Sequence, residues 1–180
     1  MKKTFAILAF ISISILCSAQ TYLKGNAAYW AVGITNVSIE TRLSNKLTFN
    51  SDLVFSPWES IRNNAFLFGQ IIPEVRFYPN EAFKGFYVGG YAAFQVFKMT
   101  KWNYWNTGKY QEGRGFALGL SIGYQVPISN RWNLDVYGGA GWQNSQYKGY
   151  YMNTDKMYVG WNGSGEWLPY KIGIAIAYRL

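Results

Sequence analysis

Large apolar residues alternate with small or polar ones over long stretches of this chain. Between Phe116 and Ile128 every second residue is large and apolar, and the residues between them are mostly Ala, Gly, Ser and Gln. The segment Tyr170–Leu180 repeats the pattern. Because successive side chains of a strand point to opposite faces, a period of two predicts strands with one apolar face and one small, polar face.

Eight segments fit this description, and we expect strands at 22–32, 35–43, 46–57, 65–78, 85–98, 113–127, 131–145 and 168–180. The connections 44–46, 79–84 and 129–131 are short and carry Asn, Pro or Ser, which favour turns. The segments 58–64, 99–112 and 146–167 are longer. With both chain ends on one side, the short turns fall on that side and the longer loops on the other, which is typical of outer-membrane barrels. The predicted fold is all-β, an eight-stranded antiparallel up-and-down transmembrane β-barrel.

The composition of the second face indicates which face meets lipid. Charged residues make up 14% of the chain, against roughly 25% in ordinary soluble domains. A soluble lipocalin-like barrel needs Lys and Glu on its outer surface, whereas the small residues here suit the crowded interior of an eight-stranded barrel. We therefore expect the apolar face to lie in lipid. A soluble periplasmic lipocalin-like barrel that carries a hydrophobic ligand is the alternative.

Aromatic residues recur at a spacing that fits the apolar band of an outer membrane. Trp132 and Trp142 share a face ten residues apart, and a tilted strand crosses the band in about 9–11 residues. Tyr170 and Tyr178 have a similar spacing. We expect both pairs to contribute to two aromatic girdles.

The charges within the expected strands fall mostly on the small face. This set comprises Lys24, Glu40, Arg42, Asp52, Glu74, Arg76, Asp135, Lys171 and Arg179. In a narrow lumen of low dielectric an unpaired charge is costly, so these groups are expected to pair and close the barrel. An ion path is the first alternative, and acid–base catalysis by Glu74 and Asp135 is the second.

The first residues read as an export signal. Lys2 and Lys3 precede the mostly apolar segment 5–16, and small residues follow at 17–19. This order predicts a signal peptide over residues 1–19, with the barrel domain over 20–180 and the outer membrane as destination. The net charge of +8 in an exported protein indicates anionic lipid or glycan as a partner and not nucleic acid.

The residue inventory argues against catalysis. The chain has no His, and its one Cys, Cys17, lies in the predicted signal peptide. Nucleophilic triads and imidazole or thiolate metal sites are therefore excluded. We expect a non-enzymatic, monomeric protein without catalytic residues, cofactor or metal.

The expected loops are rich in rings interleaved with Lys. The candidate binding surface comprises Trp102, Tyr104, Trp105, Tyr150, Tyr151 and Trp161. Rings beside ammonium groups can stack on sugars and pair with anions, which suggests contact with glycan or lipopolysaccharide. Alternatively, the rings extend the outer girdle and the Lys residues meet lipopolysaccharide phosphates without specificity.

One local pattern resembles a known recognition signal, and two others resemble a known family. Lys171-x-Gly173-x-x-Ile176-x-Tyr178 is similar to the carboxy-terminal signal read by the barrel-assembly machinery, although the chain ends on Leu180 and not on Phe. Pro73-Glu74-x-Arg76-Phe77-Tyr78 and the turn at 130–134 resemble a family of small outer-membrane barrels known only as a domain of unknown function. The resemblance implies an eight-stranded barrel of the type seen in the OmpA membrane domain, and no site residue is assigned in that family.

Overall fold

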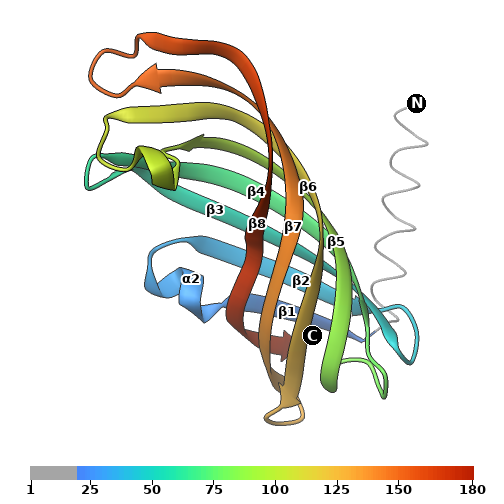
Figure 1. Ribbon diagram of the computed structural model, residues 1–180. Coiled ribbons are helices and arrows are strands. Elements are labelled where there is room, and N and C mark those ends of the chain that lie inside the picture. The colour runs from blue at the N-terminus through green and yellow to red at the C-terminus, as the bar shows by residue number, and fades with distance from the viewer. Residues whose placement is uncertain (1–19) are drawn as a thin grey trace, which may run out of the picture.

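The computed structural model describes residues 20–180, and the predicted signal peptide at 1–19 lies outside the described residues. The prediction of eight strands is confirmed, although several strands end elsewhere than predicted. Each strand pairs antiparallel with the next, and β8 pairs with β1, so that one sheet closes into a barrel (Figure 1). The elements in chain order are β1 (Thr21–Asn26), α2 (Ala27–Ala31), β2 (Thr35–Arg42), β3 (Leu47–Ile61), β4 (Asn64–Phe77), β5 (Gly85–Met99), η1 (Trp102–Tyr104), β6 (Lys109–Pro127), β7 (Trp132–Tyr151) and β8 (Met157–Arg179).

The period of two in the sequence becomes an inner and an outer face. On β6, Ala117, Ser121 and Gln125 are buried inside the barrel, whereas Leu120 between them is 73% exposed on the outside. The outer face is thus the apolar one, as predicted. Trp132 and Trp142 also lie on it.

The connections separate into two ends of the barrel. At the turn end lie the short connections 43–46, 78–84 and 128–131 together with the start of β1 and the end of β8, where Leu180 N donates to Thr21 O at 3.0 Å. At the loop end lie the connections 27–34, 62–63, 100–108 and 152–156 (Figure 1).

The first expected strand ends early. Asn26 caps a short helix, because its side-chain oxygen accepts hydrogen bonds from the backbone N–H groups of Ala28 and Tyr29 at 3.0 and 3.4 Å. The prediction of one strand over 22–32 was therefore wrong: β1 stops at Asn26, and α2 occupies 27–31. Among residues 20–180, no helix is long and apolar enough to cross a membrane.

Two of the expected loops are strand extensions. β7 continues to Tyr151 and β8 starts at Met157, so the segment 146–167 is mostly a long hairpin. Likewise β3 and β4 extend into 58–64 and meet at Arg62 and Asn63, whose positive φ angles of 50° and 63° suit a tight hairpin turn. The segment 146–167 has four glycines and no regular alternation, which hid the extensions of β7 and β8 in the sequence.

A bulge in β8 reverses one expected side chain. Gly139 pairs with Lys171, but Gly141 pairs with Leu168, so β8 has one extra residue in this interval. Both Tyr170 and Lys171 consequently point inward, at 7% and 3% exposure. Tyr170 was wrongly predicted to join a girdle.

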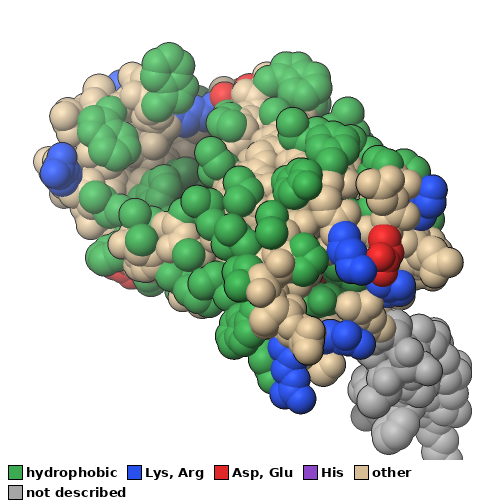
Figure 2. All heavy atoms as spheres, turned by 90° about the horizontal axis from the view of Figure 1, so that it is seen from below, with side chains coloured by type: hydrophobic (Ala, Val, Ile, Leu, Met, Phe, Trp, Pro, Cys, Tyr) green, Lys and Arg blue, Asp and Glu red, His purple; other side chains and the backbone are tan. Residues whose placement is uncertain are grey.

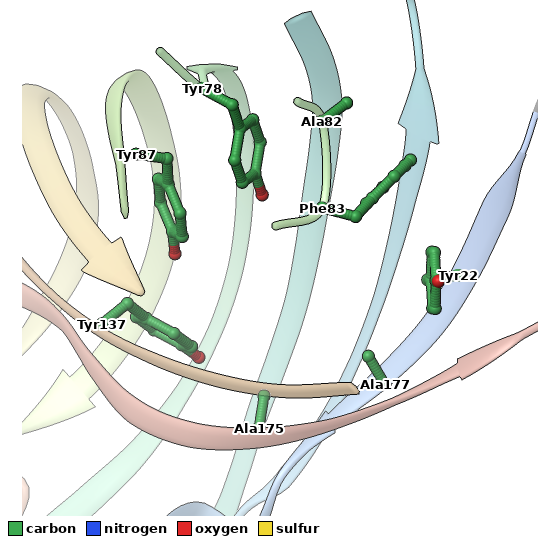
Figure 3. Packing of buried hydrophobic residues seen from close by; sticks show 8 residues of the cluster. All are labelled: Tyr22, Tyr78, Ala82, Phe83, Tyr87, Tyr137, Ala175 and Ala177. Atoms are coloured by element: carbon green, nitrogen blue, oxygen red, sulfur yellow. The ribbon is translucent and has the colours of Figure 1, made fainter. Parts of the chain in front are cut away.

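Large rings fill the inside at the turn end, where only small residues were expected (Figure 3). Tyr78, Tyr87 and Tyr137 point inward. The turn residue Phe83, at φ +69°, lies between Tyr22 and Tyr78, with ring centres 4.7 and 6.4 Å away. Glycines on neighbouring strands make room for these rings: a Cβ at Gly123 would overlap the ring of Tyr87. The small face of the sequence is therefore the receiving surface for interior tyrosines.

The wall of the barrel is uneven. Within residues 20–180, β8 pairs with β1 only from Ala175 to Arg179, and the longer part of β8 toward the loop end pairs with β7 alone. There α2 packs against β8 and β2 in place of a strand. The Asn26 side-chain amide donates to Ile172 O at 3.0 Å and links the end of β1 to β8.

Candidate functional site

A buried guanidinium lies at the centre of the lumen. Arg76 Nε donates to Glu74 Oε2 at 2.7 Å, and its Nη1 donates to Glu40 Oε2 and Asp135 Oδ2 at 3.0 and 2.8 Å. Its guanidinium carbon lies 4.5 Å from the ring centre of Tyr87. Arg76 thus joins three carboxylates from β2, β4 and β7 and stacks on β5.

Lys24 supplies a second cation beside two of the same carboxylates. Its Nζ donates to Glu40 Oε2 at 2.7 Å and also to Asp135. Neutral donors complete the two acids: Tyr78 OH donates to Glu40 Oε1 at 2.8 Å, and Tyr87 OH donates to Asp135 Oδ1 at 3.0 Å. Each carboxylate oxygen of this pair therefore has a partner, as burial requires.

Lys171 extends the network toward the loop end. Its Nζ donates to Asp52 Oδ2 at 2.7 Å and to Glu74 Oε2 at 2.6 Å. Asn50 donates to Asp52 Oδ1 at 3.0 Å, and the Ser121 hydroxyl donates to Glu74. Lys171 points into the lumen as strand parity predicts, and the bulge in β8 brings Tyr170 inward beside it.

Seven of the nine predicted lumen charges form this network, and Arg42 and Arg179 do not. Arg179 is exposed at the turn end because it follows the last interior residues of β8. Arg42 is partly exposed and forms a 3.6 Å ion pair with Glu81. A hydrogen bond from Lys84 lowers the pKa of Glu81. The buried network therefore holds four carboxylates and three cations, not four acids and five bases.

The turn-end half of the lumen is closed. Arg76, Tyr78, Tyr87 and Phe83 are each at most 1% exposed, so no water-filled passage runs past them. Glu74 and Asp135, the candidate acid and base, are both held in ion pairs within this closed region. Residues 20–180 contain no group of three His, Cys, Asp or Glu residues arranged to hold a metal ion.

The loop-end half of the lumen is hollow. A cavity of about 440 Å³ lies there. One side carries Gln70, Gln95, Gln143 and Ser145, and the rest is mainly aromatic and aliphatic, with Tyr29, Ile34, Phe66, Phe68, Leu168 and Tyr170. Trp102 and Trp105 lie at its mouth, beside the ion pair between Lys101 and Glu166 at 2.8 Å. Sequence reasoning missed this cavity, because its lining comes from segments that lie far apart in the sequence.

The predicted ring surface is divided. Trp102, 84% exposed, and Trp105 belong to the cavity mouth. Tyr104 and Tyr151 instead face Lys109, whose Nζ lies 5.8 and 5.7 Å from their ring centres. These two rings are engaged by a cation of the chain itself.

Tyr150 and Trp161 lie in neither of these two regions but in a shallow groove on the outer wall near the loop end. We call this the basic groove; its lining includes Phe55, Lys98, Arg114, Lys148, Tyr150 and Trp161. Lys98, Glu112 and Lys148 stand opposite one another on three adjacent strands, and Lys148 Nζ lies 4.8 Å from the Trp161 ring centre. Three bases and one acid gather here on an otherwise apolar face.

The residues of the predicted assembly signal alternate across the wall. Lys171 and Gly173 point inward, and Ile176 is 41% exposed on the outside. A Cβ at Gly173 would overlap the side chain of Asn26. Tyr178 packs on Trp132, with ring centres 4.8 Å apart.

The sequence matches one family model, described as protein of unknown function DUF3575, over residues 4–180. The chain belongs to this family. No curated protein matches the chain, and no solved structure matches it. The family description assigns no activity, so any function has to be argued from the barrel itself.

Proposed function

We propose that this member of the DUF3575 family is a non-enzymatic, integral outer-membrane β-barrel with a structural or surface-binding role. The observation that carries the proposal is the inversion of polarity across the wall. On β6, Leu118, Leu120 and Ile122 are 57%, 73% and 59% exposed on the outside, while the seven charges of the network lie inside. Figure 2 shows apolar side chains spread over the middle of one side, with Lys and Arg toward its two ends.

Water is a poor solvent for such a surface. Monomeric soluble proteins rarely expose a contiguous apolar patch larger than a few hundred Å². Hydrocarbon, in contrast, favours outward Leu, Ile and Phe but offers no partner to backbone N–H and C=O groups. A closed antiparallel sheet satisfies these groups within the wall wherever adjacent strands pair, which supports residence in a bilayer.

The height of the apolar band also fits. Trp132 pairs with Tyr178 near the turn end, and Trp142 lies beside Trp167 with ring centres 6.1 Å apart. Ten residues rise about 33 Å along a strand, which is about 25 Å along the axis at a tilt near 40°. This matches the usual apolar band of outer-membrane barrels, so the positions of the two ring pairs support two aromatic girdles.

The basic groove supports a surface role. Lys148 lies six residues beyond Trp142 on the same outward face, above the proposed band. With the loop end outside the cell, Lys98, Arg114 and Lys148 would face the phosphates and sugars of lipopolysaccharide, with Trp161 beside them. Insertion would use the barrel-assembly machinery, through the pattern at 171–178.

The deciding experiment is to express the full chain and fractionate the cells. We expect the protein in urea-washed outer membranes, migrating differently on a gel before and after boiling. A protein released by osmotic shock and stable in buffer without detergent would refute the proposal. It would favour the second candidate, a soluble lipocalin-like carrier, which the loop-end cavity supports.

A further inference from the structure

The loop-end cavity has a hydrogen-bonding side. Gln70 Nε2 donates to Gln95 Oε1 at 2.8 Å across β4 and β5, and Gln143 pairs with Ser145 on β7. Gly115 on β6 lies between the two pairs, because a Cβ there would be 3.0–3.1 Å from Gln95, Gln143 and Ser145. Four adjacent strands thus present amides and a hydroxyl without a bulky side chain in their midst.

The rest of the lining is mainly apolar, apart from the residues at the mouth. The rings of Phe66 and Phe68 meet edge to face with their centres 5.3 Å apart. Ile34, just before β2, and Leu168 and Tyr170 of β8 complete this apolar part. Among residues 20–180, the Gln143 side-chain oxygen and the Tyr170 hydroxyl are buried without a hydrogen-bond partner. Both residues line the cavity, so its wall holds hydrogen-bonding groups that the chain itself leaves unused.

The cavity lies beside the interval where strand pairing in the wall is incomplete. Tyr29 of α2 and Ile34 line it from one bank, and Leu168 and Tyr170 of β8 line it from the other. Between these banks β8 has no β1 residue to pair with, since the pairing stops at Ala175. The wall beside the cavity is thus closed by α2, which packs against β8, and not by strand pairing.

Charge narrows the class of ligand. The charged residues of the lining are Lys101 and Glu166, which neutralise one another at 2.8 Å. Neither a carboxylate nor an ammonium group would find a free partner there, and burying one unpaired is costly. The volume of about 440 Å³ falls within the usual range for small-molecule sites, about 300–1,000 Å³.

We propose that the cavity binds an uncharged single-chain amphiphile, such as a monoacylglycerol. Its hydroxyl head lies against Gln95, Gln143 and Ser145, and its hydrocarbon chain runs along Phe68 toward α2. Entry of the chain from a bilayer rests on the proposed membrane location. The cavity and its head-group contacts do not.

Native mass spectrometry of the purified full chain in a zwitterionic detergent tests the proposal, with monoolein and oleate as probes. Phe68→Trp fills the cavity, and Ser145→Leu removes a hydroxyl from its polar side. Phe94→Trp is the matched control, because Phe94 is 50% exposed on the outside of β5. We expect the unmodified protein and the control to retain one monoolein, both cavity variants to bind it at least tenfold more weakly, and oleate at pH 8 to bind at least tenfold more weakly than monoolein.

Equal retention by all four proteins would place the lipid on the outer wall and overturn the site, as would no retention at all. Oleate binding as tightly as monoolein would overturn the uncharged class. Heat-modifiable migration checks each variant for folding, and Ser145→Leu decides if Phe68→Trp does not fold. A protein soluble without detergent would refute the membrane proposal, yet its retention of monoolein would still support the cavity.

Discussion

Replacing Arg76 by Met should reveal how strongly the barrel depends on its interior charges. The side chain is 1% exposed and joins Glu40, Glu74 and Asp135 at 2.7–3.0 Å. Met has a similar length and no charge, so the change leaves a lumen with four carboxylates and two cations. Breaking a buried ion pair by removing one partner costs about 3–5 kcal/mol, because the remaining charge stays buried. Loss of the contact with the Tyr87 ring adds about 0.5–2 kcal/mol.

We therefore expect Arg76→Met to lower the free energy of unfolding by about 4 kcal/mol, a factor of roughly a thousand in the equilibrium constant. The assay is urea unfolding in lipid vesicles, followed by the gel mobility of the folded form. Arg42→Met is the matched control: its ion pair with Glu81 spans 3.6 Å and is partly exposed, so a loss of about 0–1 kcal/mol is expected.

A double variant separates charge from packing. Glu74→Gln removes one carboxylate that Arg76 neutralises, so combining it with Arg76→Met should cost less than the sum of the two single changes. A coupling of about 1–3 kcal/mol is typical of residues in one network. If Arg76→Met costs no more than Arg42→Met, or if the two changes add without coupling, the network does not stabilise the barrel as argued.

Three further predictions test the wall, the interior and the surface. Ile122→Lys, at mid-height on the outer face, should cost about 2–4 kcal/mol in vesicles, and Ile128→Lys at the turn end about 0–1; equal costs in urea unfolding would contradict a bilayer around β6. Gly123→Val should cost about 1–3 kcal/mol because it overlaps the Tyr87 ring, whereas Gly90→Val has open space around it; the same unfolding assay should separate them. Lys148→Gln and Trp161→Ala should weaken lipopolysaccharide binding in a salt-dependent way and leave folding intact, while Trp102→Ala on the cavity mouth should change neither; unaltered binding by the first two would remove the basic groove from the surface role.

The sequence specified the strands and their faces because period two is a local property. The outward Leu120 and the inward Ser121 follow from alternation alone. The end of β1 at Asn26 could not be predicted in the same way, because Ala27–Ala31 is as apolar as a strand. Only the hydrogen bonds that Asn26 accepts as the N-cap show that this segment is a helix. The side chain of Tyr170 was assigned to the wrong face because a bulge changes which residues of a strand point inward. Apart from Pro169, nothing in the sequence indicated this bulge.

The candidate site was predictable in part. The charges on inward positions, from Lys24 to Lys171, were recognisable because strand parity places them in the lumen. Arg179 has the right parity but lies where the wall ends, and strand length is poorly fixed by sequence. Tyr137 has the same strand parity as Asp135, but the sequence does not show which glycines make room for interior rings, such as Gly123 beside Tyr87.

The pairing of β1 with β8 closes the barrel, and it determines which step of folding comes last. Tyr22 pairs with Arg179, so the contact that completes the cylinder joins residues almost a whole chain apart. Contacts of such long sequence separation form late, because the intervening chain must first be confined. The hairpins β1–β2 through β7–β8 can form between neighbouring segments, but the pairing of β1 with β8 must wait for the final segment. Until then both edges are open, and a chaperone that shields them would protect this protein at its most aggregation-prone stage.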